Sequence, residues 1–179
     1  PADGRTKHGD WANPVGWDVS DATLEVIEPA GLPAEYRYLS NYRKNPVSLT
    51  FFSAPTPPGG LEADLFLYEN MSPEDLAAAD TEGKVILSSR TSGSMKRFLA
   101  PNGIRGMITD QIERGNSDFI NAVQWQNTWS DQPGGWVTTA WDDKSTFCFS
   151  VSQKQGDYLR GLLRSGQRVR VRAVVDSRF

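Results

Sequence analysis

The sequence offers very few side chains that could carry out catalysis or bind a metal. Its single histidine, His8, lies among Lys7, Gly9 and Asp10 near the start of the chain. A co-catalytic zinc site needs several histidines and carboxylates that converge on the metals, and a Ser-His-Asp triad would also have to use His8. We therefore interpret His8 as a solvated side chain, and we expect no catalytic residue and no metal ligand in this chain.

The other candidate nucleophiles and acids have structural explanations. Cys148 is the only cysteine, and its place in the apolar run 147–149 predicts a buried, inert thiol. Ser94 follows a glycine but lacks the flanking glycines of a nucleophile elbow. Asp142 and Asp143 could do acid–base work or bind a cation, but adjacent residues of a strand point to opposite faces. We expect this pair to lie in a turn.

Four of the six tryptophans fall in one polar segment, residues 116–144, and they indicate binding more than catalysis. Aromatic rings among Asn, Gln, Asp and Thr combine apolar faces with polar rims, as a sugar-stacking or protein-docking surface requires. The alternative is that this long segment packs its own rings onto the domain as a small satellite core. Under the docking interpretation, at least one ring stays exposed and contacts a partner or substrate. The candidate contact residues are Trp125, Trp129, Trp136 and Trp141.

A row of arginines near the end of the chain, Arg168, Arg170 and Arg172, could meet phosphates or protect the edge of a strand. The formal net charge of -3 gives no general attraction to nucleic acid, and we find no nucleic-acid motif. No apolar stretch approaches the ~18 residues that a membrane span needs. We therefore expect neither a nucleic-acid partner nor a membrane span.

The order of breakers and apolar runs divides the chain into two regions. Residues 1–60 form an N-terminal lead-in segment of short strands, which are predicted at 22–28 and 47–52. This segment closes with the Pro- and Gly-rich stretch 54–60, which cannot continue a helix or a central strand. We place the domain boundary there, so that the second region covers residues 61–179.

The second region alternates strands with short helices. Ser72 is a suitable N-cap for a helix that has Pro73 in its first position and that Gly83 ends. Strands are predicted at 63–69, 85–87, 104–109 and 145–151, and another short helix at 94–100.

Residues 152–175 form the clearest unit of the sequence. A capping box of Ser152 and Gln155 opens a helix, Gly166 ends it, and a strand with alternating valines follows. A strand–helix–strand unit of this length predicts parallel or mixed pairing through a crossover. We expect the helix to pack one face on the sheet, so that Leu162→Ala costs roughly 2–5 kcal/mol. That face consists of Tyr158, Leu159, Leu162 and Leu163.

These motifs, in this order and spacing, resemble the protease-associated (PA) domain, a non-catalytic module usually carried by peptidases. The resemblance covers about two thirds of the chain. The elements predict an α/β domain with a small, mostly β core and two or three flanking short helices, and the resemblance implies that this core is barrel-like. The matching residues are Gly83 to Leu87, Arg90, Ala100, Gly103 to Ile108, Gly156 to Leu159, Leu162, Leu163, Gly166 and Val169 to Val171.

The first sixty residues carry a second resemblance. Residues 3–6, 9–11, 17–18 and 53–56 look like the stretch that precedes an inserted PA domain in some zinc aminopeptidases of the M28 class. In such proteins the metallopeptidase body would lie outside this segment. The resemblance therefore implies zinc only in that body and no cofactor in this chain.

Taken together, the two resemblances imply a non-catalytic PA domain of a larger peptidase, which modulates substrate access or mediates protein interaction. Its partners would be the peptidase domain of the same full-length protein and, as a second candidate, a peptide substrate. A secreted or cell-envelope location is implied by the family alone. Two alternatives stay open: a free-standing carbohydrate- or peptide-binding module that uses the tryptophan segment, and a hydrolase, which the single histidine disfavours.

Overall fold

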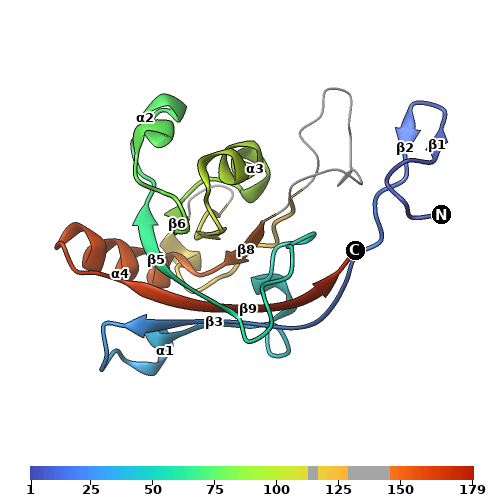
Figure 1. Cartoon of the computed structure of the whole chain (residues 1–179). Helices are drawn as coiled ribbons and strands as arrows, with labels where there is room; N and C mark the ends of the chain where they lie inside the picture. Colours follow the sequence, from blue (N-terminus) through green and yellow to red (C-terminus); the bar gives the residue numbers. More distant parts are fainter. Residues whose placement is uncertain (113–116, 129–145) are drawn as a thin grey trace.

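A mixed seven-stranded sheet forms the centre of the molecule, in a computed structural model that describes residues 1–112, 117–128 and 146–179 (Figure 1). The order of the strands in space is β4-β3-β9-β5-β6-β7-β8. Their bounds are Asp18–Glu28 (β3), Tyr38–Asn41 (β4), Leu61–Leu67 (β5), Val85–Ser88 (β6), Gly106–Thr109 (β7), Phe147–Ser150 (β8) and Arg170–Arg178 (β9). A separate two-stranded sheet pairs β1 (Lys7–His8) with β2 (Trp11–Ala12).

The sheet has a parallel half and an antiparallel half. Strands β5, β6, β7 and β8 run parallel to one another, whereas β9 is antiparallel to both β5 and β3, and β4 is antiparallel to β3. The segment after β4 contacts β8, at the other edge of the sheet. Leu49 and Phe149 form an isolated bridge there, and the Thr50 amide donates a hydrogen bond to the Cys148 carbonyl (2.9 Å). The sheet therefore nearly closes on itself, which confirms the expected α/β fold with a barrel-like core.

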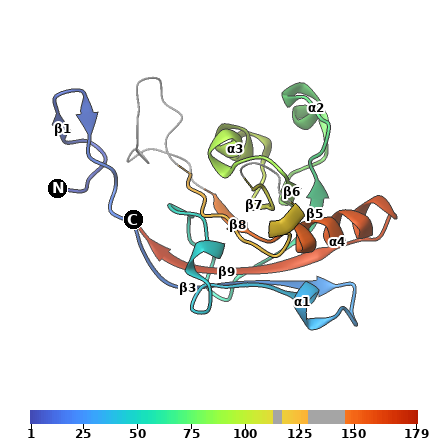
Figure 2. The ribbon, with the colours of Figure 1, turned by 180° about the vertical axis from the view of Figure 1, so that it is seen from behind.

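The described ranges hold four short α-helices, against the two or three expected. They are α1 (Ala34–Arg37), α2 (Pro73–Ala78), α3 (Ser92–Leu99) and α4 (Gln153–Arg164). Helices α2 and α3 lie on one side of the parallel strands, and β3 and β9 lie on the other (Figures 1 and 2). The parallel strands are thus covered on both faces, which explains why all four residues of β6 are buried.

Alternate residues of the parallel strands fill two apolar clusters. Val85 and Leu87 point into the barrel, where they join residues of β3, β9 and α4. Ile86, Met107 and Cys148 point outward and pack under α2 and α3. The continuous apolar run predicted for this strand therefore reflects burial on both faces, as expected.

Local signals placed the starts of α2 and α4 well, because each of these helices opens with a capping box. The Ser72 hydroxyl accepts a hydrogen bond from the Asp75 amide (3.1 Å), and the Asp75 carboxylate accepts one from the Ser72 amide (2.9 Å). Ser152 and Gln155 form the predicted capping box of α4, and Gly166 follows this helix with φ +79°.

Three element assignments were wrong in detail. Helix α3 begins at Ser92, because Thr91 caps it, and not at residue 94. Helix α2 ends at Ala78, and Gly83 lies in a later turn with φ +74°. Residues 47–52 are not a strand: a 3-10 turn at Pro46–Ser48 precedes isolated bridges, and Phe52 has φ +65°, which interrupts an extended backbone.

The final strand gives the sheet its mixed pairing, one of the two arrangements that the sequence predicts. Strand β9 does not pair with β8; after α4 the chain crosses to the opposite wall of the barrel and lies between β3 and β5. Its residues Val171, Ala173 and Val175 point inward, as does Val169 just before it, in the alternation that the sequence predicts. The sheet is mixed because this return strand is antiparallel to both neighbours.

The face of α4 that packs on the barrel centres on Leu159, which is fully buried, whereas Leu162 and Leu163 are only partly buried. We expect Leu159→Ala to lower the free energy of unfolding by about 3 kcal/mol, because it leaves a cavity in the core. Leu162→Ala, the matched control, should cost clearly less than first expected. Urea unfolding of the two variants checks this order, and a reversed order would contradict the placement of α4.

Candidate functional site

The structure describes one of the four candidate tryptophans. Trp125 exposes 46% of its surface, and its ring centroid lies 6.1 Å from that of Phe51. Trp129, Trp136 and Trp141 lie outside the described residues, as does the Asp142–Asp143 pair. The proposed binding role of these tryptophans therefore stays a prediction.

Trp125 belongs to a group of rings that sequence reasoning did not bring together. We call Trp17, Phe51 and Trp125 the aromatic patch. Phe51 is 42% exposed, and its ring lies 4.8 Å from that of Trp17 and at the same time contacts Trp125. Tilted ring pairs at these separations are favourable, and the exposed faces leave apolar area open to a partner.

Backbone hydrogen bonds hold the central ring in place. The Phe51 amide donates to the Gln126 carbonyl (3.0 Å), and the Phe51 carbonyl accepts from the Thr128 amide (3.0 Å). The next residue, Phe52, takes the left-handed conformation and is 6% exposed. Left-handed backbone is rare for a bulky residue, so this turn is held by its surroundings. It buries one phenylalanine while its neighbour stays exposed.

The aromatic patch lies where β3 begins and β9 ends. Trp17 immediately precedes β3, and its indole nitrogen donates to the Ser53 carbonyl (3.0 Å). The Ser177 hydroxyl of β9 donates to the same carbonyl (2.8 Å). Asp18 and Arg178 pair across the two strands and form an ion pair of 2.6 Å. The outer ends of these two strands therefore lie side by side next to the patch.

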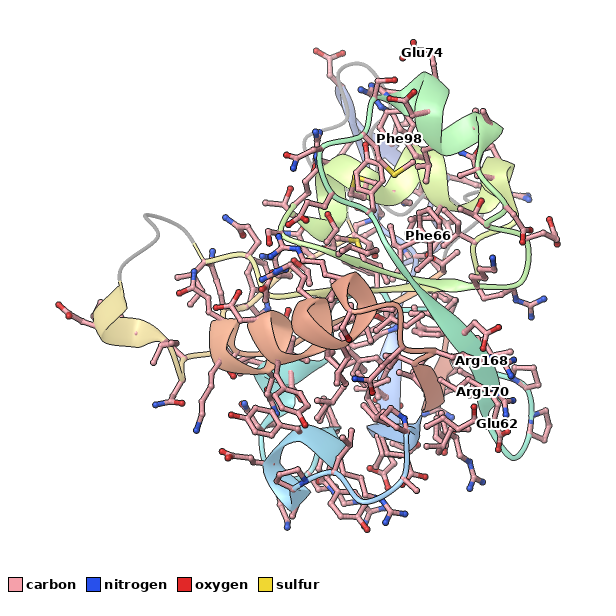
Figure 3. The ribbon with its side chains drawn as sticks, turned by 90° about the vertical axis from the view of Figure 1, so that its left-hand side faces the viewer. Glu62, Phe66, Glu74, Phe98, Arg168 and Arg170 are labelled. Carbon is pink, nitrogen blue, oxygen red and sulfur yellow. The ribbon has the colours of Figure 1, made fainter. Side chains whose placement is uncertain are left out.

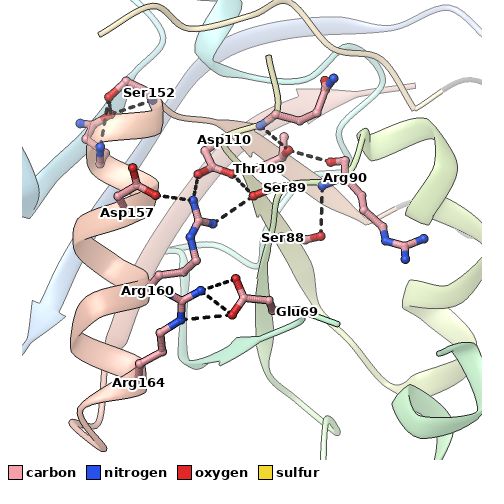
Figure 4. Close-up of polar contacts among 12 residues, drawn as sticks. Glu69, Ser88, Ser89, Arg90, Thr109, Asp110, Ser152, Asp157, Arg160 and Arg164 are labelled. Carbon is pink, nitrogen blue, oxygen red and sulfur yellow. Dashed lines mark hydrogen bonds and ion pairs between the residues drawn. The ribbon is translucent and has the colours of Figure 1, made fainter. Parts of the chain in front are cut away.

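The second candidate region is polar and lies at the carboxyl ends of the parallel strands (Figure 4). We call Ser89, Asp110, Asp157 and Arg160 the arginine cluster. The Arg160 guanidinium contacts the Asp110 carboxylate directly, and it donates to Asp157 (2.9 Å) and to the Ser89 hydroxyl (3.1 Å). The Ser89 hydroxyl in turn donates to Asp110 (2.8 Å). Both side chains of the central pair are buried, at 10% and 1% exposed.

The arginine cluster is structural. Burial alone would lower the pKa of Arg160, but hydrogen bonds to Asp110 and Asp157 raise it above its ordinary value. The glycine at position 156 lets α4 approach Asp110, the residue that follows β7, because a Cβ there would stand 2.0 Å from an Asp110 oxygen. The sequence analysis missed the pair of Arg160 with Asp110. The local pattern shows only Asp157, three residues before Arg160 on α4.

Beside the arginine cluster lies a cavity of about 270 Å3, between the ends of β5 and β6. Glu69 stands at its wall and binds Arg164 through both carboxylate oxygens, at 2.6 and 2.7 Å. Hydrogen bonds from Arg164 hold the pKa of Glu69 below its ordinary value. Ser88, the last residue of β6, and Arg90, two residues later, form another part of the wall.

None of the described catalytic candidates is placed for chemistry. Cys148 is completely buried, which confirms the expected burial, and this burial raises the pKa of its thiol to about 12. His8 is exposed on β1, and Ser94 lies inside α3 and not on an elbow. Within residues 1–112, 117–128 and 146–179, no three His, Cys, Asp or Glu side chains are grouped so that they could hold a metal ion.

Two of the three arginines in the row pair with carboxylates, and the row does not lie at an edge of the sheet. The third, Arg172, donates a hydrogen bond to the Gly59 carbonyl (3.1 Å). Strand β9 is central in the sheet, so Arg170 and Arg172 cannot protect an edge. Arg168 pairs with Asp64 (2.9 Å), and Arg170 pairs with Glu28 (3.1 Å) and Glu62 (3.3 Å). Figure 3 shows Arg168, Arg170 and Glu62 together on the surface of β5 and β9. Carboxylates of neighbouring strands thus neutralise these charges.

The fold is similar to part of several solved peptidase structures. A peptidase M28 precursor from Shewanella amazonensis SB2B matches with a TM-score of 0.55 and 14% identity, over 91% of this chain and 36% of its own. BSAP, a zinc aminopeptidase from Bacillus subtilis, matches with a TM-score of 0.54 and 17% identity, over 90% of this chain and 32% of its own. An aminopeptidase from Aneurinibacillus sp. strain AM-1 matches with a TM-score of 0.53 and 16% identity, over 91% of this chain and 32% of its own.

The chain shares its fold with a part of these peptidases. It spans about a third of the length of each of the three. The sequence matches no protein-family model and no curated protein sequence. None of the helices in the described ranges has the length and hydropathy that crossing a bilayer requires. At these identities the likeness concerns the fold, and activity is a separate question.

Proposed function

We propose that this chain is a non-catalytic protease-associated domain of a larger M28-type zinc peptidase, where it shapes substrate access or holds a partner chain. The observation that carries this proposal is the fold: it matches known peptidases over nine-tenths of this chain but only a third of theirs. Zinc and its ligands would then belong to the peptidase body of the full-length protein. The buried thiol, the exposed histidine and the satisfied arginine cluster support a structural role for this part.

The proposal predicts that the chain on its own binds no catalytic zinc and cleaves no aminoacyl substrate. Its described residues lack a ligand set, and its one histidine is exposed. The measurement is zinc content after dialysis, together with hydrolysis of aminoacyl substrates. The full-length protein is the matched control and should retain zinc and show chelator-sensitive cleavage. Stoichiometric zinc in the isolated chain, or chelator-sensitive cleavage by it, would overturn the proposal.

The aromatic patch supports a docking role within such a protein. Because β3 begins and β9 ends beside it, a chain that continued from both strands would leave the domain next to these exposed rings. A peptidase body attached there would face Phe51 and Trp125. Aromatic residues with partly open faces are the side chains that most often dominate such contacts.

Trp125→Ala is expected to weaken binding of the chain to its separately expressed peptidase body by about 2 kcal/mol, or about 30-fold. The loss of stability should be smaller than for a core substitution, because almost half of this side chain is exposed. Calorimetric titration of the two parts measures the first effect, and urea unfolding measures the second.

Tyr38→Ala is the matched control for Trp125. Tyr38 is 58% exposed, and it pairs with Glu25 of β3, about 23 Å along the strand from Asp18. This variant removes an exposed ring far from the patch and should leave binding unchanged. Equal losses for the two variants would contradict a docking role for the patch.

The exposed rings also favour a second candidate, a free-standing module that binds carbohydrate or peptide. Flat aromatic faces can stack on sugars as well as on a protein surface. The same two variants separate the candidates. A free-standing module would bind an oligosaccharide or peptide through Trp125 without any peptidase body, and it would show no affinity for that body.

A further inference from the structure

The cavity between the ends of β5 and β6 is not used by the proposed function. It holds about 270 Å3 and adjoins the arginine cluster through Ser89 and Arg160. Figure 4 shows Ser88, Ser89, Arg90 and Arg160 around the end of β6, with Glu69 beside them. Ligands of α/β proteins bind preferentially beyond the carboxyl ends of parallel strands, which is where this cavity lies.

Within the part of the chain that the structure describes, one positive charge of the cavity wall is not paired with a carboxylate. Arg160 is occupied by Asp110 and Asp157, and Glu69 is occupied by Arg164. The Arg90 guanidinium has no carboxylate partner among the residues that the structure describes, and it lies 5.5 Å from the centre of the Tyr68 ring. Of the two arginines in this wall, Arg90 is therefore the one without a carboxylate partner among the described residues, and its guanidinium is stacked on an aromatic face with its hydrogen-bond donors available.

Two neutral side chains of the same wall have spare hydrogen-bonding capacity. Ser88 is 1% exposed, and its oxygen accepts a bond from the Arg90 amide (3.2 Å). Within the described ranges, nothing accepts the hydrogen of this hydroxyl. Asn70 has φ +52°, and its carboxamide has no partner in the same ranges. A buried hydroxyl hydrogen without an acceptor, next to a cavity, is a place where a ligand oxygen gains a bond.

We propose that this cavity binds a carboxylate group, as carried by an acidic side chain or by the end of a peptide. The guanidinium of Arg90 offers a fork that matches a carboxylate, and the Ser88 hydroxyl and the Asn70 amide offer further donors. The volume suits one side-chain-sized group and not a larger ligand. Glu69 in the same wall disfavours a doubly charged anion such as phosphate. This assignment holds for an accessory domain and for a free-standing module alike.

The test is a titration of the whole 179-residue chain, followed by amide chemical shifts of Asn70, Ser88 and Ser89. Three matched probes differ only in where the carboxylate is: N-acetyl-glutamate α-amide has it on the side chain, N-acetyl-glutamine has it at the end, and N-acetyl-glutamine amide has none. We expect saturable shifts, with millimolar affinity, for one or both acids and none for the neutral amide. The stronger acid identifies the source of the carboxylate.

Arg90→Gln should weaken binding of that acid about tenfold, the loss expected for one charge-assisted hydrogen-bonding group. The matched control is Arg97→Gln, since Arg97 is also exposed and stacked on a ring, that of Phe98 at 4.8 Å, but does not line the cavity. Asn70→Asp adds a negative charge to the wall and should also weaken binding. This second variant tests the cavity even if Arg90→Gln fails to fold.

Several results would overturn the assignment. Equal shifts with the neutral amide would exclude recognition of charge. Unchanged affinity in both Arg90→Gln and Asn70→Asp, or an equal loss in Arg97→Gln, would place binding elsewhere. If inorganic phosphate binds more tightly than either acid, the ligand class is phosphate and not carboxylate. If neither acid causes a saturable shift, the cavity is not a carboxylate site.

Discussion

A fragment of residues 61–179 is expected not to fold without residues 1–60. Strand β9 would lose β3, which pairs with it from Asp18 to Glu28. The barrel cluster would lose Ala22, Leu24 and Val26, all at most 1% exposed. This would leave a central strand with an open edge and an uncovered apolar face. Circular dichroism and the dispersion of amide signals would show the loss of cooperative structure.

Removal of residues 1–16 alone is the matched control. Strands β1 and β2 pair with each other outside the main sheet, so this shorter deletion keeps Trp17, β3 and the barrel cluster. We expect this chain to unfold cooperatively in urea. A folded 61–179 fragment would show instead that the boundary placed at residue 60 separates an independent domain.

Asp110→Ala should lower the free energy of unfolding by about 3–5 kcal/mol. It removes the buried partner of Arg160, whose side chain is 10% exposed, and leaves that charge with the outer carboxylate alone. Asp157→Ala removes the outer carboxylate, which is 66% exposed, and should cost at most about 1 kcal/mol. Urea unfolding of both variants measures the difference.

The double variant Asp110→Ala with Arg160→Met tests the cause of that loss. If an unpaired buried charge destabilises Asp110→Ala, replacing the arginine by an apolar side chain should recover much of the stability. If the double variant is less stable than Asp110→Ala, the arginine contributes mainly through packing and through its bond to Ser89, and the charge argument fails.

The parts of the fold that were predictable depend on contacts within four residues. The capping boxes of Ser72 with Asp75 and of Ser152 with Gln155 set helix starts through bonds between residues three apart. Helix α1 gave no such signal: it has four residues and no side-chain cap. Its place is determined by tertiary contacts, among them Tyr36 stacked on Tyr158 of α4 at 3.9 Å.

The candidate sites depend on contacts that no local pattern contains. Arg160 and Asp110 lie 50 residues apart, and each alone is an ordinary polar residue next to an apolar element. Phe51 was assigned to a strand, so its position beside Trp17 and Trp125 could not be anticipated. The arginine row was open to interpretation as a phosphate contact or as protection of an edge, because alternation shows which face a residue takes but not which strands lie on either side.

The pairing of Asp18 with Arg178 has a mechanical consequence. Strand β3 starts and β9 stops at the same end of an antiparallel pair, so tension applied through the flanking chain pulls the two strands apart at that end. The hydrogen bonds between antiparallel strands lie across the strands, along this direction of pull, and would be loaded one after another. The domain would therefore peel open from Asp18 toward Glu28 under low force, and the aromatic patch would be the first part of the surface to separate.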